Sequence, residues 1–425
     1  MAVVPASGQA GVLRQRNFRR FYLGYSTSLF GTGMEPIGVA FAVLATGGSA
    51  ADLGFVLTGG VVANVLCLAA GGVVADRFGR RVVMLVSDTV RCLAEAGFAG
   101  LVLFGHPAIW TLFLLYALQY TGTGFFTPAL LGLTPDIVSA EDLHQANVLN
   151  GLARDVGRVF GPAIAGLLVA ASSPGVVLAI DAGTYAISVA SLASLRIPAY
   201  SRQTGRSLLG DLRDGWGAWR AQRWIWVTSV KFALFNAVVL APYLVLGPVV
   251  AKHHLGGSGS WGLILAAQGV GSVVAGPLII RWRPARPLAV ITVVQLAWAL
   301  PVLCLALLLP VPVIAVAAFF AGLGSASFNA IWTTTLQRNV PTELMARVNS
   351  LDFLFSYALA PVGLVLAAAV SQQIGTTSVL LTGAGWQVVS TLAVLALPVV
   401  RQFRADPEPI SQPVDNGGGR HRAEM

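Results

Sequence analysis

One acidic residue stands deep inside the first long apolar segment of the chain. Glu35 lies about fourteen residues into the run 21–45, or roughly 21 Å along a helix that rises 1.5 Å per residue. A bilayer core is about 30 Å thick, so a carboxylate there costs on the order of 3 kcal/mol unless it is paired, hydrated or protonated. Such an acid can carry a proton between the two faces of a membrane. Alternatively, it recognises a cationic substrate and moves no protons.

Polar and aromatic side chains recur at helical spacing in four of the apolar segments. Residues three or four apart share one face of a helix, and a shared face that remains polar in an apolar segment indicates a cavity. The residues expected to line it are Ser28, Thr32, Tyr116, Gln119, Tyr120, Thr123, Phe235, Asn236, Tyr243, Asn329 and Thr333. Aromatic and amide groups favour a bulky amphipathic ligand over a sugar or an inorganic ion. The alternative is that these groups only join one helix to another by hydrogen bonds.

Other charged residues also fall within apolar segments. Five of them are expected to form a structural or gating ion network: Asp88, Arg91, Arg154, Asp155 and Arg158. Glu95 and Asp181 are further candidates for buried acids, although Asp181 could instead lie near a membrane interface.

The composition shows what kind of fold must hold these groups. Of 425 residues, 56% are hydrophobic and 11% are charged, against about 25% charged in a soluble domain. A water-facing surface needs more ions than this, so the chain is expected to be an all-α membrane protein. No phosphate-binding loop and no metal-ligand spacing occurs in the sequence. We therefore expect no cofactor, no metal and no enzymatic activity.

Apolar runs long enough to span a bilayer divide the chain into six plus six crossings. They lie at 21–45, 53–75, 82–105, 109–132, 146–170, 175–196, 225–250, 261–281, 287–309, 312–336, 348–371 and 377–400. The expected organisation is one six-helix bundle in 1–196, a linker with an interfacial amphipathic helix in 197–224, a second bundle in 225–401 and a disordered tail in 402–425. Matching Gly, Pro and Asn positions about 200 residues apart favour a parallel repeat of the two halves.

The basic residues predict the orientation of the chain. Arginines cluster before the first crossing, in the central linker and in every second loop, whereas Lys252 is the only basic residue expected in a loop on the other side. Cytoplasmic loops retain Lys and Arg, so both termini and the linker are expected in the cytoplasm. The net charge of +9 then reports topology and contact with anionic lipid, and no nucleic-acid partner is expected.

The loop between the second and third crossings carries the most specific motif, GVVADRFGRR at 72–81. It contains Gly72, Asp76, Arg77, Gly79 and Arg80, in a G-x-x-x-D-R-x-G-R-R pattern. This loop resembles the signature of the major facilitator superfamily. The resemblance implies twelve transmembrane helices in two pseudo-symmetric six-helix bundles, with substrate bound between them.

The same resemblance assigns the loop a gating role. Asp76 is expected at the N-terminus of the eleventh crossing, near Val348, and Arg80 is expected to pair with Asp136. These contacts would latch the halves together on the cytoplasmic side in the outward-facing state.

The fifth crossing carries a second motif with Gly157, Gly161, Pro162 and Gly166. It is similar to the glycine and proline signature of exporters in the superfamily, although Ala165 replaces an expected glycine and the upstream glycine is missing. Such a small-residue face also packs helices closely in proteins that export nothing. Weaker resemblance over the whole chain points to the branch of drug, macrolide and siderophore exporters.

The sequence therefore predicts a secondary transporter that exports hydrophobic or amphipathic small molecules, driven by proton antiport. The partners expected are a small-molecule substrate, protons and lipid, with the protein a monomer in a bacterial plasma membrane. An importer or a lipid flippase on the same fold is the nearer alternative. A membrane-embedded enzyme or sensor is the remote one.

Overall fold

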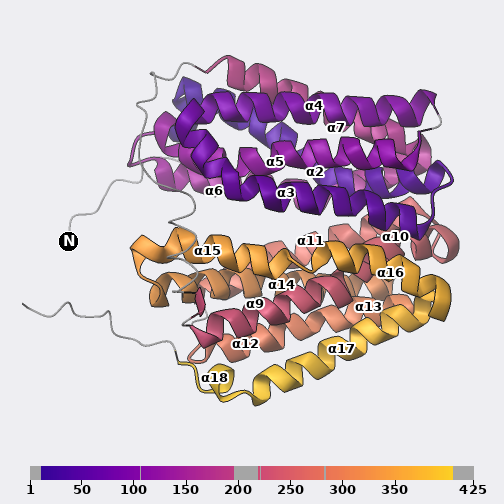
Figure 1. The fold of residues 1–425 in the computed structure, drawn as a ribbon. Coiled ribbons are helices and arrows are strands. Elements are labelled where there is room, and N and C mark those ends of the chain that lie inside the picture. Colours follow the sequence, from indigo (N-terminus) through magenta and orange to yellow (C-terminus); the bar gives the residue numbers. More distant parts are fainter. Residues whose placement is uncertain (1–10, 106, 196–218, 221, 282–283, 405–425) are drawn as a thin grey trace, which may run out of the picture.

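The computed structural model of the protein describes residues 11–105, 107–195, 219–220, 222–281 and 284–404. Long helices run side by side through these ranges in two bundles (Figure 1). The predicted amphipathic helix of the linker and the predicted disordered tail lie largely outside the described residues.

The first bundle contains six long helices. They are α2 (Arg16–Ala45), α3 (Ala50–Phe78), α4 (Arg80–Phe104), α5 (Ile109–Ile137), α6 (Leu143–Ala171) and α7 (Pro174–Ala193), preceded by the short α1 (Gly11–Arg14). Within the bundle, α2 packs against α6 and α7, while α5 packs against α3 and α4.

The second bundle divides several crossings into shorter pieces. The seventh crossing is α9 (Arg223–Phe235), the π-helix η1 (Asn236–Leu240) and α10 (Ala241–His254), followed by α11 (Ser258–Arg281). The ninth is α12 (Pro287–Val294), the 3-10 turn η2 (Gln295–Trp298) and α13 (Ala299–Ala306), followed by α14 (Val311–Asn339). The remaining helices are α15 (Thr342–Tyr357), α16 (Ala360–Ile374), α17 (Thr376–Ala396) and α18 (Pro398–Arg401).

Prolines explain three interruptions: η1, η2 and the break between α15 and α16, which together form the eleventh crossing. Pro242, Pro301 and Pro361 each follow a break by no more than a few residues. Proline has no N–H to donate to the carbonyl four residues earlier and its ring crowds that carbonyl, so the helix changes locally to a π or 3-10 form or bends. The seventh, ninth and eleventh crossings therefore each contain an irregular turn part-way along their length.

Nine helical segments of the described residues are long and apolar enough to cross a membrane by length and composition. The helices α4, α5 and α6 are outside that set, although they have 25, 29 and 29 residues and run alongside the others. Charged residues such as Asp88 and Arg91 lower the hydropathy of α4. The fold is consistent with the twelve predicted crossings.

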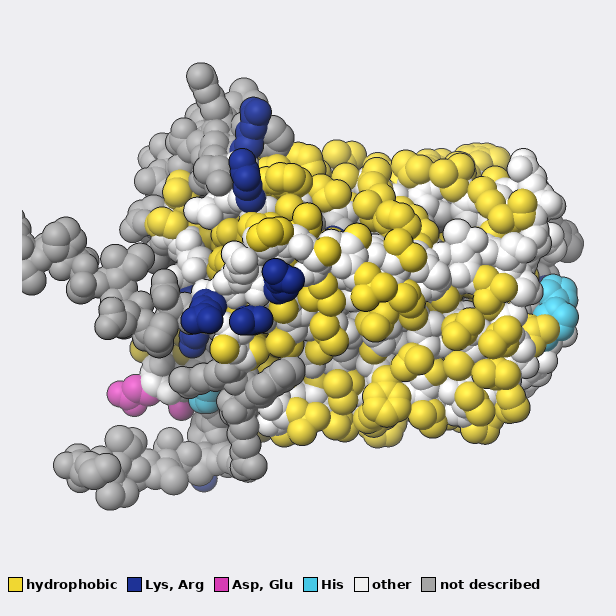
Figure 2. Space-filling model, turned by 90° about the horizontal axis from the view of Figure 1, so that it is seen from below, with side chains coloured by type: hydrophobic (Ala, Val, Ile, Leu, Met, Phe, Trp, Pro, Cys, Tyr) yellow, Lys and Arg dark blue, Asp and Glu magenta, His cyan; other side chains and the backbone are white. Residues whose placement is uncertain are grey.

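The two ends of the molecule differ in charge. Basic side chains gather at one end, beside the described chain termini, whereas the other end shows histidine side chains and no Lys or Arg in this view (Figure 2). We call the first the basic end, marked by Arg80 and Arg81, and the second the Lys252 end. Between them runs a belt of exposed apolar side chains (Figure 2). Leu66 and Leu392 are among the large apolar residues that are exposed in the two bundles. Such a surface is stable against hydrocarbon chains and not against water.

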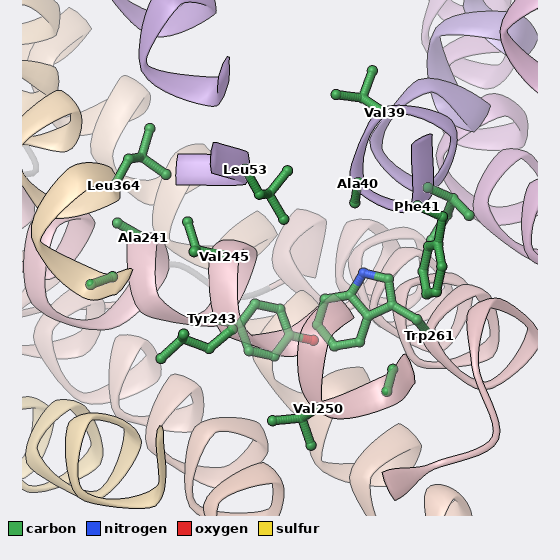
Figure 3. Packing of buried hydrophobic residues seen from close by; sticks show 14 of the residues in the cluster. Val39, Ala40, Phe41, Leu53, Ala241, Tyr243, Val245, Val250, Trp261 and Leu364 are labelled. Carbon is green, nitrogen blue, oxygen red and sulfur yellow. The ribbon is translucent and has the colours of Figure 1, made fainter. Parts of the chain in front are cut away.

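The hydrophobic core is shared by the bundles only at the Lys252 end. One cluster combines residues of α2 and α3 with residues of α10, α11 and α16. Figure 3 shows this packing, with Phe41 beside Trp261 and Leu53 facing Val245. At the basic end each bundle has a separate cluster. The bundles therefore meet tightly at one end and not at the other.

Candidate functional site

A cavity of about 490 Å³ lies between the two bundles. The first bundle contributes Leu68, Thr127 and Leu131, and the second bundle supplies the rest of the lining. These further residues are Thr228, Ser229, Phe232, Phe328, Asn329, Trp332, Thr333, Leu336, Asn349, Ser350, Asp352, Phe353, Ser356 and Tyr357. We call this space the interface cavity. Its volume and mixed aromatic and polar lining fit a small organic ligand.

Hydrogen bonds between the bundles accompany the closed Lys252 end. Lys252 Nζ donates to the carbonyl oxygen of Leu44 at 2.7 Å, and Ser258 Oγ donates to that of Gly166 at 3.0 Å. Thr58 Oγ1 also donates to the carbonyl oxygen of Pro361 at 3.3 Å. Each bond joins a residue of one half to the backbone of the other, so all three must break if this end opens.

The glycine signature of α6 permits close helix contact. A Cβ on Gly161 would lie 2.7 Å from Gly33 Cα in α2, and one on Gly166 would lie 2.7 Å from the Ser258 carbonyl oxygen of the other bundle. A side chain at either position would force the helices apart. Gly157 likewise packs against the backbone of α2 at Leu29. The motif therefore serves packing within the first bundle and closure between the bundles.

A buried ion pair is the centre of a polar cluster inside the first bundle. Arg91 Nη1 lies 3.0 Å from Asp88 Oδ1, and both side chains are almost completely buried. Arg91 also donates to the Tyr185 hydroxyl at 2.6 Å, and its guanidinium stacks 4.1 Å from the centre of that ring. Of the five residues expected to form an ion network, Asp88 and Arg91 pair with each other, and Arg154, Asp155 and Arg158 are in neither of the two salt bridges of the described residues. Arg154 instead donates to the Tyr25 hydroxyl.

Glu35 lies beside this cluster and is 2% exposed. Arg91 acts on its carboxylate electrostatically, and Tyr116, Gln119 and Tyr120 of α5 face it. Its Oε1 atom has no partner with hydrogen-bond geometry in the described part of the chain. The structure therefore brings the predicted acid together with three residues predicted from a different segment.

Two further acids are buried in the same bundle. Glu95 is 1% exposed and Asp181 is fully buried within the protein. Both Glu95 oxygens and Asp181 Oδ2 lack hydrogen-bond partners among the described residues. With Glu35 and Asp88, the described residues of this bundle include four buried carboxylates and one buried guanidinium, that of Arg91. We call these five residues the acidic cluster.

The predicted cavity residues divide between several environments. Asn329 and Thr333 line the interface cavity. The other predicted residues do not line it in this conformation: Ser28, Thr32, Tyr116, Gln119, Tyr120, Thr123, Phe235, Asn236 and Tyr243. In the first bundle, the Thr32 hydroxyl pairs with Tyr185 at 2.9 Å, so it belongs to the surroundings of Arg91.

In the seventh crossing the π-helix η1 changes which residues share a face. Phe232, before η1, lines the cavity, whereas Tyr243, after it, packs against Trp261 and Trp298 in the shared core. Phe235 is buried against Trp298, and Asn236 donates to the Ser356 carbonyl oxygen at 2.9 Å. Regular helical spacing does not continue through a π turn.

Asp352 is a cavity residue that the sequence interpretation missed. Its Oδ1 accepts a hydrogen bond from Ser229 Oγ at 2.5 Å, and its Oδ2 accepts one from Trp332 Nε1 at 2.9 Å. Among the described residues that line the interface cavity, it is the only acidic or basic side chain. The sequence did contain a signal for this site, because Asp352 is an acidic residue four positions into the predicted crossing 348–371.

The signature loop forms a tight turn at the basic end. Gly79 joins α3 to α4 with a φ of 91°, a backbone conformation that favours glycine. Arg80 Nη1 lies 3.0 Å from Asp136 Oδ1 and 2.8 Å from the Gly132 carbonyl oxygen. The structure thus brings Arg80 and Asp136 together, although both belong to the first bundle.

The other expected contacts of this loop cross between the bundles. The helix that carries the eleventh crossing begins at Thr342, so Val348 lies in its second turn and not at its N-terminus. Apart from its own chain neighbours and the backbone of its own helix, no described atom lies within 4 Å of the position that a Cβ on Gly72 would take. Asp76 and Arg77 are in the last turn of α3, at the end where the bundles are apart.

Comparisons with known proteins agree with this architecture. Residues 21–364 match the Major Facilitator Superfamily. Macrolide efflux protein A of Streptococcus pyogenes is 20% identical over 90% of this chain and 94% of its own length. Multidrug efflux pump Tap of Mycolicibacterium fortuitum is 25% identical over 81% of this chain and 87% of its own. The crystal structure of the nucleoside transporter NupG superposes with a TM-score of 0.72 at 15% identity, covering 92% of this chain and all of NupG.

Proposed function

The chain belongs to the Major Facilitator Superfamily and is a multi-pass membrane transporter, and we propose that it exports hydrophobic or amphipathic small molecules from the cytoplasm by proton antiport. The observation that carries this proposal is the interface cavity between two bundles that meet tightly at only one end. Two end states of such a pair of bundles give alternating access to one site. Efflux proteins similar over nearly the whole chain favour export.

We place the basic end in the cytoplasm. The arginines Arg80 and Arg81 lie at this end with the described chain termini, and cytoplasmic loops retain basic residues. On this assignment the interface cavity faces the cytoplasm and can load substrate there. We further propose that the protein is a monomer in the plasma membrane, because the two bundles of one chain form the interface cavity.

The acidic cluster supports proton coupling. If all four carboxylates were ionised, Arg91 would balance one and leave three negative charges in the apolar interior. Uncompensated buried charges cost several kcal/mol each, and protonation removes that cost. Glu35 is the member that faces α5, so we assign it the coupling proton. Glu35 would bind and release this proton on opposite sides of the membrane as the two bundles move.

The signature loop is proposed to stabilise the opposite end state. When the basic end closes, Asp76 would approach the N-terminus of α15, where the helix dipole favours a negative charge. The Arg80–Asp136 pair would hold the loop in position for that contact. The latch would hold the basic end closed while the cavity faces outward.

A transport assay across a panel of compounds tests the direction of transport. The chain is produced in bacterial cells that lack their own pumps, and intracellular drug concentrations are compared with cells producing Glu35→Gln. We expect lower accumulation of at least some amphipathic compounds with the wild-type chain. Higher accumulation would indicate an importer, and flipping of a fluorescent phospholipid alone would indicate a flippase.

A further inference from the structure

We propose that the interface cavity selects amphipathic organic cations, with Asp352 receiving the positive charge and an aromatic wall of the second bundle receiving the apolar body. This inference rests on the proposed function and names the substrate class of the same cavity. It assigns substrate recognition to the second bundle and leaves the proton to the first.

The position of Asp352 is fixed by groups on two other helices. Ser229 of α9 and Trp332 of α14 each donate a hydrogen bond to a different oxygen of its carboxylate. Ser356 of the same helix, α15, also donates to Asp352 Oδ1, at 3.5 Å. A carboxylate offers about four acceptor sites, so these three bonds orient the group and leave capacity for a ligand. The charge is thus presented at a defined place and does not depend on a flexible side chain.

No described cation neutralises this charge. The two salt bridges of the described residues are Arg80–Asp136 and Arg91–Asp88, both in the first bundle. The lysine on the helix next to Asp352, Lys231, donates instead to Gln295 Oε1 at 2.8 Å. An acid in a partly dehydrated cavity is stabilised by an opposite charge, and a cationic substrate would supply it.

Aromatic rings continue away from Asp352 along the cavity. Phe328 stacks against Trp332 and Phe232, with ring centres 6.4 and 5.1 Å apart. Tyr357 meets Phe232 edge to face at 6.0 Å and lies 4.5 Å from Phe353. The faces of aromatic rings attract cations and also bind apolar rings. The same wall therefore suits both parts of an amphipathic cation.

On the opposite side of the cavity, the described lining residues are uncharged. The first bundle presents Leu68, Thr127 and Leu131 there, and these groups can contact an apolar body but cannot balance an anion. The lining as a whole thus carries one negative charge and no described positive one. A cation is favoured over an anion of the same size and shape.

Tetraphenylphosphonium and tetraphenylborate test this charge selection because they share one shape and have opposite charges. Binding of each ion to the purified full-length wild-type protein in neutral detergent is measured by equilibrium dialysis. We expect the cation to bind at least about tenfold more tightly than the anion. Equal affinities, or tighter binding of the anion, would overturn the proposal.

Substitutions then locate the selection at Asp352. We expect Asp352→Asn to weaken cation binding about tenfold and to leave anion binding equal or stronger, whereas Asp352→Glu restores cation preference. Glu141→Gln, which removes an exposed acid in the loop before α6, is the matched control and should bind like the wild type. Cation affinity unchanged in a folded Asp352→Asn, verified by thermal unfolding, would refute the assignment.

These binding measurements separate the site from the transport direction. If the protein exports no compound but binds cations in a way that depends on Asp352, the binding site is supported and the export proposal is wrong. If the protein exports organic cations and Asp352→Asn does not change that export, the export proposal is supported and the assignment of the cation site to Asp352 is wrong. If Asp352→Asn does not fold, the comparison of the two ions on the wild type and on Asp352→Glu decides the question.

Discussion

Lys252 is expected to stabilise the conformation in which the Lys252 end is closed. Its Nζ lies 2.7 Å from the carbonyl oxygen of Leu44, and Leu44 is in the last turn of α2. Carbonyls at a helix C-terminus have no intrahelical partner, and the helix dipole favours a cation beside them. The bond joins the two bundles, so it exists only while this end is closed.

The size of the effect follows from the exposure of the lysine. A hydrogen bond from a charged donor contributes about 1.5–3 kcal/mol, and fixing a long, exposed side chain offsets up to about 1.5 kcal/mol of this. A net contribution of about 1 kcal/mol corresponds to about a fivefold change in the ratio of closed to open molecules. Lys252→Met should lose that stabilisation, and Lys252→Arg should keep most of it.

Distances between spin labels measure this ratio. Labels on cysteines introduced at Ser172 and Thr377, exposed at the Lys252 end in opposite bundles, report its opening. The native cysteines Cys67, Cys92 and Cys304 are replaced first.

With these labels, Lys252→Met should raise the fraction with long distances, and a neighbouring change, His254→Gln, should not. An unchanged distance distribution in Lys252→Met, or an equal shift in Lys252→Arg and Lys252→Met, would refute the reasoning.

Two further substitutions should shift the same equilibrium in opposite directions. Gly166→Leu places a side chain where a Cβ already meets the Ser258 carbonyl oxygen at 2.7 Å; the same spin labels should then report an open Lys252 end, and closure as in the wild type would show that the glycine is not needed. Asp76→Asn weakens the proposed latch by about 1 kcal/mol, so labels at Ala140 and Gln402, exposed at the basic end, should report more open molecules and transport should slow by about fivefold. Wild-type transport by well-expressed Asp76→Asn would leave the loop as a topology signal alone.

Local patterns predicted much of the buried chemistry. Glu35, Asp88, Arg91, Glu95 and Asp181 could be recognised because each interrupts an apolar segment, and all five are buried in the first bundle. Placing a charged side chain in the membrane interior costs free energy, so a charged residue in an apolar run indicates a functional or structural role. The pairing of Arg80 with Asp136 came instead from the resemblance of the loop to a known family, since the two residues are far apart in sequence.

Tertiary contacts decided the rest of the site. Periodicity assigned Asn236 and Tyr243 to the cavity face, but Pro242 lies beside a π-helix that rotates the second half of the crossing, and Tyr243 faces the core. Asp352 could not be given a role from its own segment, because Ser229 and Trp332, which orient it, come from helices distant in sequence. Which end of the interface is closed is likewise a property of one conformation.

Proton-driven export is tested most directly with purified protein in lipid vesicles. Vesicles with an acidic lumen and the basic end outward should accumulate substrate as protons leave, and each pH unit supports about tenfold accumulation for exchange of one proton per substrate. We expect accumulation to disappear when the gradient is collapsed and in Glu35→Gln, while Glu141→Gln transports normally. Accumulation that persists without the gradient, with full activity in Glu35→Gln, would contradict proton antiport.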